Sequence, residues 1–225
     1  MNEGAGARSG LAATSETARR SVAPDEAGGP SRTLLLVRHG ETTWNAERRL
    51  QGQVDVPLSE RGRRHVRALR RLVARYKPER AVTSDLARAR ETAALLGFAD
   101  ATVDARWREA HLGLWQGKGI DVLRREDEVR YAAWRAGEIT PEAAEPWAEV
   151  CARIKIAVRE LAAGSVLVVT HGGPIRAVCA TLLGLAPRSL VPVSPASLTI
   201  VELAGGPRLR AFNLTAYEDG AEPPD

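Results

Sequence analysis

Two of the four histidines of this chain each follow a short apolar segment and precede a glycine. His39 comes after residues 34–38, Leu-Leu-Leu-Val-Arg, and His171 comes after residues 166–170, Val-Leu-Val-Val-Thr. A lone histidine is more often structural than catalytic. Beside His39, however, Arg38 supplies a forked cation suited to phosphate or carboxylate, and the following glycine lets another group approach closely. The pattern therefore indicates chemistry on an anionic substrate, with a histidine as the candidate nucleophile.

The residues after His171 add an anion-binding element. Gly172 and Gly173 leave room, and Pro174 suits the first position of a helix. The start of such a helix presents unpaired N–H groups and a partial positive charge. Both histidines are expected at the carboxyl ends of strands, where ligands bind in α/β sheets. We therefore predict one pocket in which Arg38, the two histidines and this helix start bind a phosphate group.

Two further residues are weaker candidates for the same pocket. Arg88 lies one turn into a predicted helix that follows the strand 81–83, so its side chain can reach the same strand ends. Taken alone, one arginine among many is a surface residue. Glu109 stands in residues 107–117, a segment rich in Trp and Gly, where a carboxylate suits proton transfer. Each of these two residues is a candidate for the site only because the two histidines are predicted at the same strand ends.

Short apolar segments alternate with amphipathic ones along most of the chain. Predicted strands cover residues 33–37, 81–83, 102–103, 165–170, 197–203 and 208–214. Predicted helices run from the N-cap Ser59 to before Pro78, from a cap at Ser84 or Asp85 to Gly97, and over residues 121–135, 146–163 and 172–184. This alternation is typical of an α/β fold with a mainly parallel sheet covered on both faces. The last two strands are predicted to form a hairpin at the sheet edge.

Composition places the chain among globular proteins, with 44% hydrophobic and 27% charged residues. No apolar run approaches the ~18 residues of a membrane span. The net charge of +4 is carried almost wholly by arginine, which is densest in residues 61–75. In that segment Val66, Leu69 and Val73 form one apolar stripe. We therefore interpret the arginines as the solvent-exposed face of an amphipathic helix. We expect binding to neither nucleic acid nor membrane.

One domain is expected over residues 32–215. Residues 1–31 hold few large apolar side chains and are interpreted as a disordered tail, and residues 216–225 as a flexible one. The N-terminus has no apolar signal segment and the chain has only two cysteines, so a reducing cytoplasm is the expected location. The metal, nucleotide and serine-hydrolase motifs HExxH, CxxC, GxGxxG, the Walker loop and GxSxG are not found. Those chemistries are therefore disfavoured.

Four blocks of sequence resemble the signature of the histidine phosphatase superfamily, also called phosphoglycerate-mutase-like. The first block is residues 36–45 (LVRHGETTWN), continued by Gln51-Gly52, Asp55, residues 57–59 (PLS) and residues 61–63 (RGR); the others are residues 83–93 (TSDLARARETA), residues 108–113 (REAHLG) with 115–117 (WQG), and residues 169–176 (VTHGGPIR). They stand in the family's order and span the chain from about residue 33 to 214. The resemblance implies a three-layer α/β sandwich with a mainly parallel central sheet.

The resemblance also implies a role for each candidate residue. His39 would be the nucleophile that forms a phosphohistidine, with its Nδ1–H donated to a backbone carbonyl so that Nε2 is free to attack. Glu109 would protonate the leaving oxygen and then accept a proton from the hydrolytic water. The substrate would be bound by a set of charged and polar groups, namely Arg38, Asn45, Gln51, Gly52, Arg88, His171 and Gly172. Because arginines and histidines supply the positive charge, neither a metal nor another cofactor is expected.

Within this family the phosphatase branch fits better than the mutases. Cofactor-dependent phosphoglycerate mutases typically carry Arg-His-Tyr after the acid and a longer insertion before the second histidine, whereas Glu109 is followed by Ala-His-Leu. The expected reaction is hydrolysis of a small sugar phosphate or phosphoglycerate-type ester by a monomer or homodimer. An α-ribazole-type nucleotide phosphatase and a broad-range phosphatase fit the same residues. A cofactor-dependent mutase and a non-catalytic protein that binds phosphorylated ligands also stay open.

Two segments depart from what this branch often shows. Ala144-Glu145-Pro146 stands where many members have Gly-Glu-Ser or Gly-Glu-Thr, and Pro195-Ala196-Ser197 stands where Asn-Ala-Ser is frequent. Both are expected in loops near the pocket entrance, where they would affect substrate choice. Four apolar residues are candidates for a wall around the leaving group or for ordinary packing: Trp44, Leu50, Trp107 and Trp115.

Overall fold

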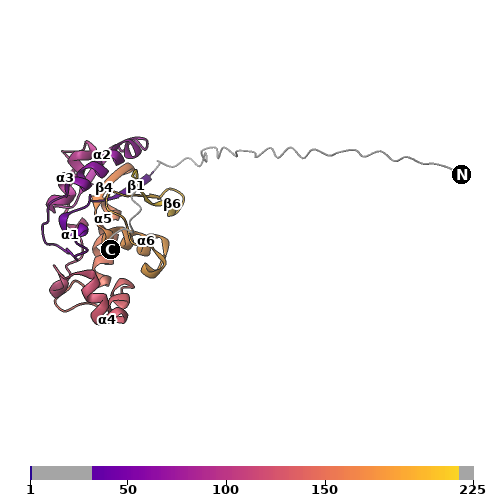
Figure 1. The fold of residues 1–225 in the computed structure, drawn as a ribbon. Helices are drawn as coiled ribbons and strands as arrows, with labels where there is room; N and C mark the ends of the chain where they lie inside the picture. The colour runs from indigo at the N-terminus through magenta and orange to yellow at the C-terminus, as the bar shows by residue number, and fades with distance from the viewer. Residues whose placement is uncertain (2–31, 218–225) are drawn as a thin grey trace.

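The chain folds around one six-stranded sheet (Figure 1). A computed structural model describes Met1 and residues 32–217. The strands are β1 (Arg32–Arg38), β2 (Arg80–Thr83), β3 (Thr102–Val103), β4 (Gly164–Thr170), β5 (Leu198–Glu202) and β6 (Arg208–Leu214), in the spatial order β3-β2-β4-β1-β5-β6. The pairings among β1 to β4 are parallel, and those of β5 with β1 and with β6 are antiparallel. The predicted mainly parallel sheet and its edge hairpin are confirmed.

Side chains on the central strands alternate between two helical layers. The helices are α1 (Thr43–Ala46), α2 (Glu60–Ala74), α3 (Ala87–Leu96), α4 (Ile120–Arg135), α5 (Trp147–Glu160) and α6 (Gly172–Leu183). On one face of the sheet, Leu35 and Val169 pack with α2 and α3. On the other face, Leu36 and Val168 pack with α5 and α6. Because neighbouring residues of a strand point to opposite faces, the short apolar strands bury both sides and produce the predicted three layers.

The helix α2 shows how the arginine-rich segment folds. Ser59 caps it as predicted, since its Oγ accepts a hydrogen bond from the Gly62 N–H at 2.9 Å. The stripe of Val66 and Leu69 is buried against the sheet, whereas every arginine of the helix except Arg63 is exposed. The interpretation of this segment as an amphipathic helix is confirmed.

The start of α3 corrects one prediction, because the helix begins after Leu86 and neither Ser84 nor Asp85 is its N-cap. The N–H of Ala87 donates instead to the Asp55 carboxylate at 2.9 Å, across 32 positions of sequence. An N-terminal N–H group needs an acceptor, but the acceptor can come from any loop that the fold brings near. A cap supplied from so far away leaves no signal at the helix start.

The helix α4 belongs to a smaller cluster at one end of the molecule (Figure 1). That cluster contains Leu50, Leu112, Trp115, Ile120, Leu123 and Tyr131. Within α4, Asp127 has non-helical backbone angles of φ −159° and ψ 87°, and its carboxylate accepts from the Arg130 N–H at 2.8 Å. The helix is therefore kinked, and its second half restarts with its own cap.

The end of the described chain packs on helix α2. The expected tails, residues 1–31 and 216–225, lie outside the described residues except for Met1, Ala216 and Tyr217. The Tyr217 ring stacks on the His65 ring with 3.8 Å between centroids, so the described end of the chain packs on α2. Within the described part, no helix combines the length and apolar character that crossing a bilayer would need.

Candidate active site

The two histidines follow adjacent parallel strands, and the sheet brings them together as predicted. Arg38 at the end of β1 is in register with Thr170 at the end of β4. The His39 N–H donates to the Thr170 carbonyl at 2.9 Å. The ring centroids of His39 and His171 are consequently 5.0 Å apart, and α6 begins at the next residue, Gly172.

Hydrogen bonds select one tautomer of His39. Its Nδ1 lies 2.7 Å from the Gly40 carbonyl oxygen. A carbonyl only accepts, so Nδ1 carries the proton and Nε2 has the free electron pair. That Nε2 accepts a hydrogen bond from Arg88 Nε–H at 3.3 Å. The ring is thus held in the tautomer expected of a nucleophile.

Burial and guanidinium groups favour the neutral form of both histidines. Burial is the main reason why the pKa of His39 is well below its ordinary value, and the charges of Arg88 and Arg38 lower it further. The pKa of His171 is lowered by the same causes, with burial first. Burial also lowers the pKa of Arg88, to about 10, so Arg88 stays charged at neutral pH. A neutral imidazole beside fixed cations is suited to attack an anionic phosphoryl group.

We expect His39 to remain neutral at pH 6.5, where an ordinary histidine is half protonated. Because its pKa is lower in the folded than in the unfolded chain, the unfolded chain binds more protons below about pH 6.5. Stability is then lost as the pH falls from about 6.5 toward the folded-state pKa. An NMR titration of the histidine rings measures this, with His39→Ala and His171→Ala to assign the signals. Titration of the His39 ring near pH 6.5 would contradict the expectation.

Arg88 is fixed by backbone carbonyls of the loop before it. It comes from the first turn of α3, and only 1% of its surface is exposed. Its two terminal nitrogens donate to the Val54 carbonyl at 2.8 Å and to the Gly52 carbonyl at 2.7 Å. Gly52 has a φ of +56°, and a Cβ there would lie 2.3 Å from Gln116 Oε1. Gly52, a predicted substrate contact, therefore also holds the arginine in place.

These residues line a cavity with about 870 Å³ of empty space, including its open mouth. Eight predicted site residues line it: Arg38, His39, Asn45, Gln51, Gly52, Arg88, Glu109 and Gly172. The ninth, His171, is fully buried beside the His39 ring. Its Nε2 lies 2.9 Å from Ser84 Oγ, and its Nδ1 has no hydrogen-bond partner among the described residues. Contact of His171 with a phosphoryl oxygen stays a prediction.

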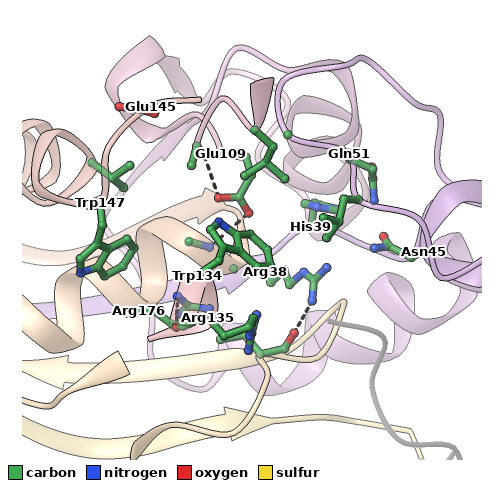
Figure 2. A pocket seen from close by; sticks show the side chains of 18 of the residues that line it. Arg38, His39, Asn45, Gln51, Glu109, Trp134, Arg135, Glu145, Trp147 and Arg176 are labelled. Carbon is green, nitrogen blue, oxygen red and sulfur yellow. Dashed lines mark hydrogen bonds between the residues drawn. The ribbon is translucent and has the colours of Figure 1, made fainter. Parts of the chain in front are cut away.

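Two amide side chains lie on the same side of the cavity as His39 (Figure 2). Asn45 uses its Oδ1 to accept from the Thr42 N–H at 3.1 Å, so its Nδ2–H₂ is the group left for a ligand. Gln51 is buried, and its Oε1 has no hydrogen-bond partner within residues 32–217. Arg38 donates from its guanidinium to the Val193 carbonyl, a residue that also lines the cavity.

Glu109 reaches the cavity from the loop between β3 and α4 (Figure 2). Its Oε2 accepts from the Gly173 N–H at 3.1 Å, and its Oε1 accepts from the Ala110 N–H at 2.8 Å. The carboxylate is therefore docked on the start of α6, the helix end that the sequence assigns to phosphate binding. Glu109, the candidate acid, and His39, the candidate nucleophile, therefore line one cavity.

Gly173 leaves the space that this carboxylate occupies. A Cβ at Gly173 would lie 2.1 Å from Glu109 Oε1. The obstructed atom is the end of a flexible side chain, so Gly173→Ala is expected to displace the carboxylate rather than unfold the chain. We expect kcat for an alkyl phosphate to fall about 10-fold, as for a misplaced catalytic group, with little change in Tm. Steady-state kinetics and thermal unfolding check this; unchanged turnover would contradict it.

The far part of the cavity contains residues that the sequence did not single out. Trp134 and Arg135 come from the end of α4, Trp147 from α5 and Arg176 from α6. In Figure 2, Trp147 and Arg176 lie on the side opposite Asn45 and Gln51. The Arg176 guanidinium carbon is 5.3 Å from the centre of the Trp147 ring. Arg176 ends the fourth sequence block, one turn after the helix start, which is a usable signal; the tryptophans stand in no motif.

The expected apolar wall is mostly wrong. Of its four members only Leu50 lines the cavity. Trp107 is fully buried in the core, and Trp115 packs against the Trp134 ring with 5.4 Å between centroids. Trp44 instead lies under the Arg49 guanidinium. The expectation of ordinary packing therefore holds for Trp107 and Trp115.

Residues 195–197, one of the two segments that differ from the usual family sequence, lie deeper than expected. The Ala196 N–H donates to the His39 carbonyl at 3.0 Å, and the Ser197 carbonyl accepts from the Arg38 N–H at 3.1 Å. This segment therefore flanks the backbone of the candidate nucleophile, and its expected place at the pocket entrance is wrong. Glu145, in the other segment that differs from the usual family sequence, does line the cavity.

The site combines a neutral imidazole, two guanidinium groups and a carboxylate in one cavity. Such a set can accept a phosphoryl group on Nε2, compensate its charge and move a proton. Within residues 32–217, no group of three or more His, Cys, Asp and Glu side chains is arranged to hold a metal ion.

A family model and the similar proteins with known names all indicate the same protein family. The family model described as histidine phosphatase superfamily (branch 1) matches residues 34–215. A glucosyl-3-phosphoglycerate phosphatase of Mycolicibacterium vanbaalenii is 40% identical over 170 residues, covering 68% of this chain and 75% of that protein. A probable phosphoglycerate mutase GpmB of Cronobacter sakazakii is 36% identical over 165 residues, covering 68% and 75%. A solved mycobacterial glucosyl-3-phosphoglycerate phosphatase in complex with VO3 has a TM-score of 0.75 at 35% identity, covering 81% of this chain and 98% of that one.

Proposed function

The chain belongs to the histidine phosphatase superfamily and is a phosphoric monoester hydrolase, and we propose that it removes the phosphate from a glycosylated phosphoglycerate through a phosphohistidine at His39. One observation carries the proposed mechanism. The Nδ1–H of His39 is held by the Gly40 carbonyl, while Nε2 faces Arg88 in the cavity. The ring is thereby oriented for attack before any substrate arrives.

In the first half of the reaction, the electron pair of His39 Nε2 forms a bond to phosphorus as the bond from phosphorus to the leaving oxygen breaks. Glu109, in its protonated form, gives its proton to that oxygen, so the oxygen leaves as a neutral hydroxyl group of the product. Arg38 and Arg88 compensate the charge on the three phosphoryl oxygens, while the Gly173 N–H at the start of α6 holds the Glu109 carboxylate.

In the second half, water replaces the alcohol. The Glu109 carboxylate takes a proton from this water as its oxygen bonds to phosphorus and the bond from phosphorus to Nε2 breaks. Inorganic phosphate leaves, and His39 and Glu109 return to their starting forms. The balance is one ester and one water to one alcohol and one phosphate, with no other reactant.

The substrate class is supported by the far part of the cavity and by the names of the relatives. The cavity extends beyond His39 and Arg88 to Trp134 and Trp147, so its walls offer contacts to more of a ligand than a bare phosphoryl group. The indole rings of Trp134 and Trp147 give this part of the cavity wall an apolar surface that suits a sugar ring. The guanidinium groups of Arg135 and Arg176 suit the carboxylate of a glycerate.

A substrate panel tests the proposal. We expect kcat/KM for glucosyl-3-phosphoglycerate to exceed that for 3-phosphoglycerate by about 10-fold or more, measured as inorganic phosphate released. Trp147→Ala should remove most of this difference and lower 3-phosphoglycerate turnover much less, since the sugar loses a direct contact whereas Arg176 loses only the ring beneath its guanidinium. Equal kcat/KM for the two esters in the wild type would refute the glycosylated class.

The same assay distinguishes a phosphatase from a mutase. The mutase is the alternative suggested by the similarity to a probable phosphoglycerate mutase. A mutase would convert 3-phosphoglycerate to its 2-phospho isomer without releasing phosphate. A phosphatase releases phosphate and accumulates no isomer. Phosphate release from alkyl esters is the outcome that we expect.

The setting of the reaction is also proposed. Cys151 and Cys179 are both free thiols, which suits a reducing compartment, and we place the enzyme in the cytoplasm. The expectations of a monomer or homodimer and of no nucleic-acid partner stay predictions.

A further inference from the structure

We propose that Arg153 is a positioning residue for Glu109, held in turn by Glu145. It fixes the backbone of the loop that carries the acid and does not touch the substrate. This inference rests on the proposed function, in which Glu109 moves the proton of the leaving group. Nothing in the family motifs points to Arg153, which stands in the middle of α5.

Arg153 binds three carbonyl groups of the acid-bearing loop. One terminal nitrogen donates to the Arg106 carbonyl at 2.5 Å and to the Arg108 carbonyl at 2.9 Å. The other donates to the Glu109 carbonyl at 3.3 Å. This loop has little regular structure of its own, so its carbonyls depend on such donors. The planar guanidinium therefore ties the backbone of this loop to α5, while the Glu109 carbonyl also accepts from Gln53 Nε2 at 3.1 Å on its other side.

Glu145 locks the arginine from the other side. Its Oε1 accepts from Arg153 Nε at 2.6 Å, and its Oε2 accepts from a terminal nitrogen at 3.0 Å. Only 19% of the arginine and 15% of the glutamate side chain is exposed, so the pair is little screened by water. A two-point contact of this kind fixes the direction of the guanidinium as well as its place.

The same glutamate also anchors the chain just after the acid. The Glu145 N–H donates to the His111 carbonyl at 2.8 Å, and Oε2 accepts from the His111 N–H at 3.3 Å. Glu109 is thus held between two fixed points, the carbonyls bound by Arg153 and the backbone of His111. Glu145 is the residue that this chain shares with the family's Gly-Glu-Ser pattern. It therefore holds the loop of Glu109 in place in addition to lining the cavity.

The geometry separates positioning from direct catalysis. Arg153 bonds the backbone of Glu109, whereas the Glu109 carboxylate bonds the N–H groups of Gly173 and Ala110. Arg153 is not among the residues that line the cavity. Its loss should therefore act through the reach of the carboxylate toward the leaving oxygen. A shift of about 1 Å in such a group can cost up to about 100-fold in rate.

The test compares two esters in Arg153→Met, Glu109→Gln and the double variant. An alkyl ester such as 3-phosphoglycerate needs its leaving oxygen protonated, whereas p-nitrophenyl phosphate has a leaving group that departs without much help. Arg106→Met is the matched control. Arg106 lies in the same loop, and its ion pairs with Asp104 and with Glu160 of α5 likewise join loop and helix without bonding Glu109.

We expect Arg153→Met to lower kcat for 3-phosphoglycerate about 10- to 100-fold and kcat for p-nitrophenyl phosphate less than about 3-fold. The double variant should be no slower on 3-phosphoglycerate than Glu109→Gln alone, because both changes remove the same function. Arg106→Met should leave both rates near wild type. Equal losses of Arg153→Met on the two esters, or losses that multiply in the double variant, would overturn the proposal.

Two further variants keep the test decisive. If circular dichroism shows that Arg153→Met does not fold, Arg153→Lys and Glu145→Gln are measured instead. Lysine keeps the charge opposite Glu145 but has no planar fork, so it should show the same ester-selective loss in weaker form. Glu109→Gln alone tests the proposed function: if it slows both esters equally, the acid assignment is wrong whatever Arg153 does.

Discussion

His39→Ala is expected to lower kcat for every phosphate ester by about 10⁴-fold or more, because the reaction loses the atom that carries the phosphoryl group. The neighbouring imidazole of His171 does not replace it, since His171 is fully buried, is not among the residues that line the cavity, and has its Nε2 2.9 Å from Ser84 Oγ. The measurement is hydrolysis of p-nitrophenyl phosphate with EDTA present, wild type beside variant. Wild-type activity should survive the chelator.

His65→Ala is the control for this variant. His65 lies on α2, where its ring stacks on that of Tyr217, and it does not line the cavity. It should retain wild-type turnover, which shows that loss of a histidine is not in itself damaging. Substantial residual activity in His39→Ala, or activity that disappears with EDTA in the wild type, would contradict metal-free histidine catalysis.

Arg88→Ala is expected to have the next largest effect, a fall in kcat of about 10²- to 10³-fold, as for loss of a fixed donor to a developing charge. Arg88 is buried, charged, and in contact with the attacking nitrogen of His39. Its removal also takes away a charge that lowers the pKa of His39, so the acidic limb of the rate profile should move to higher pH. Turnover against pH, beside wild type, measures both effects.

Arg88→Lys and Arg90→Ala complete this experiment. Lysine keeps a charge but cannot serve Gly52, Val54 and His39 at once, so Arg88→Lys should recover only part of the rate. Arg90 lies two residues on in α3 and is exposed, so Arg90→Ala should be neutral. A wild-type rate in Arg88→Lys would show that position 88 needs charge alone and not the fork.

The phosphoryl end of the site could be predicted from sequence because its residues are placed by local rules. His39 and His171 each end a short buried strand, and parallel neighbours bring their carboxyl ends to one edge. Arg88 follows from the next strand and the helix after it. Each position depends on a strand and its immediate successor, which periodicity and glycine placement reveal.

The rest of the site could not be predicted because it depends on packing between segments that are distant in sequence. Trp134 and Trp147 reach the cavity only because the fold brings α4 and α5 beside it, and nothing local distinguishes them from Trp107, which lies in the core. The proposed role of Arg153 depends on its hydrogen bonds to backbone carbonyls about 45 residues away in sequence. The predicted cap of α3 by Ser84 or Asp85 is wrong for the same reason, because the acceptor comes from the distant Asp55.

The measurement that tests the central claim most directly is trapping of the phosphoenzyme. Enzyme mixed with substrate is quenched in alkali, which preserves phosphohistidine, and the intact chain and its peptides are weighed by mass spectrometry. One added phosphoryl group on the peptide that contains His39, absent in His39→Ala, is the predicted result. Phosphate found on another residue, or equal labelling of the His39→Ala chain, would contradict it.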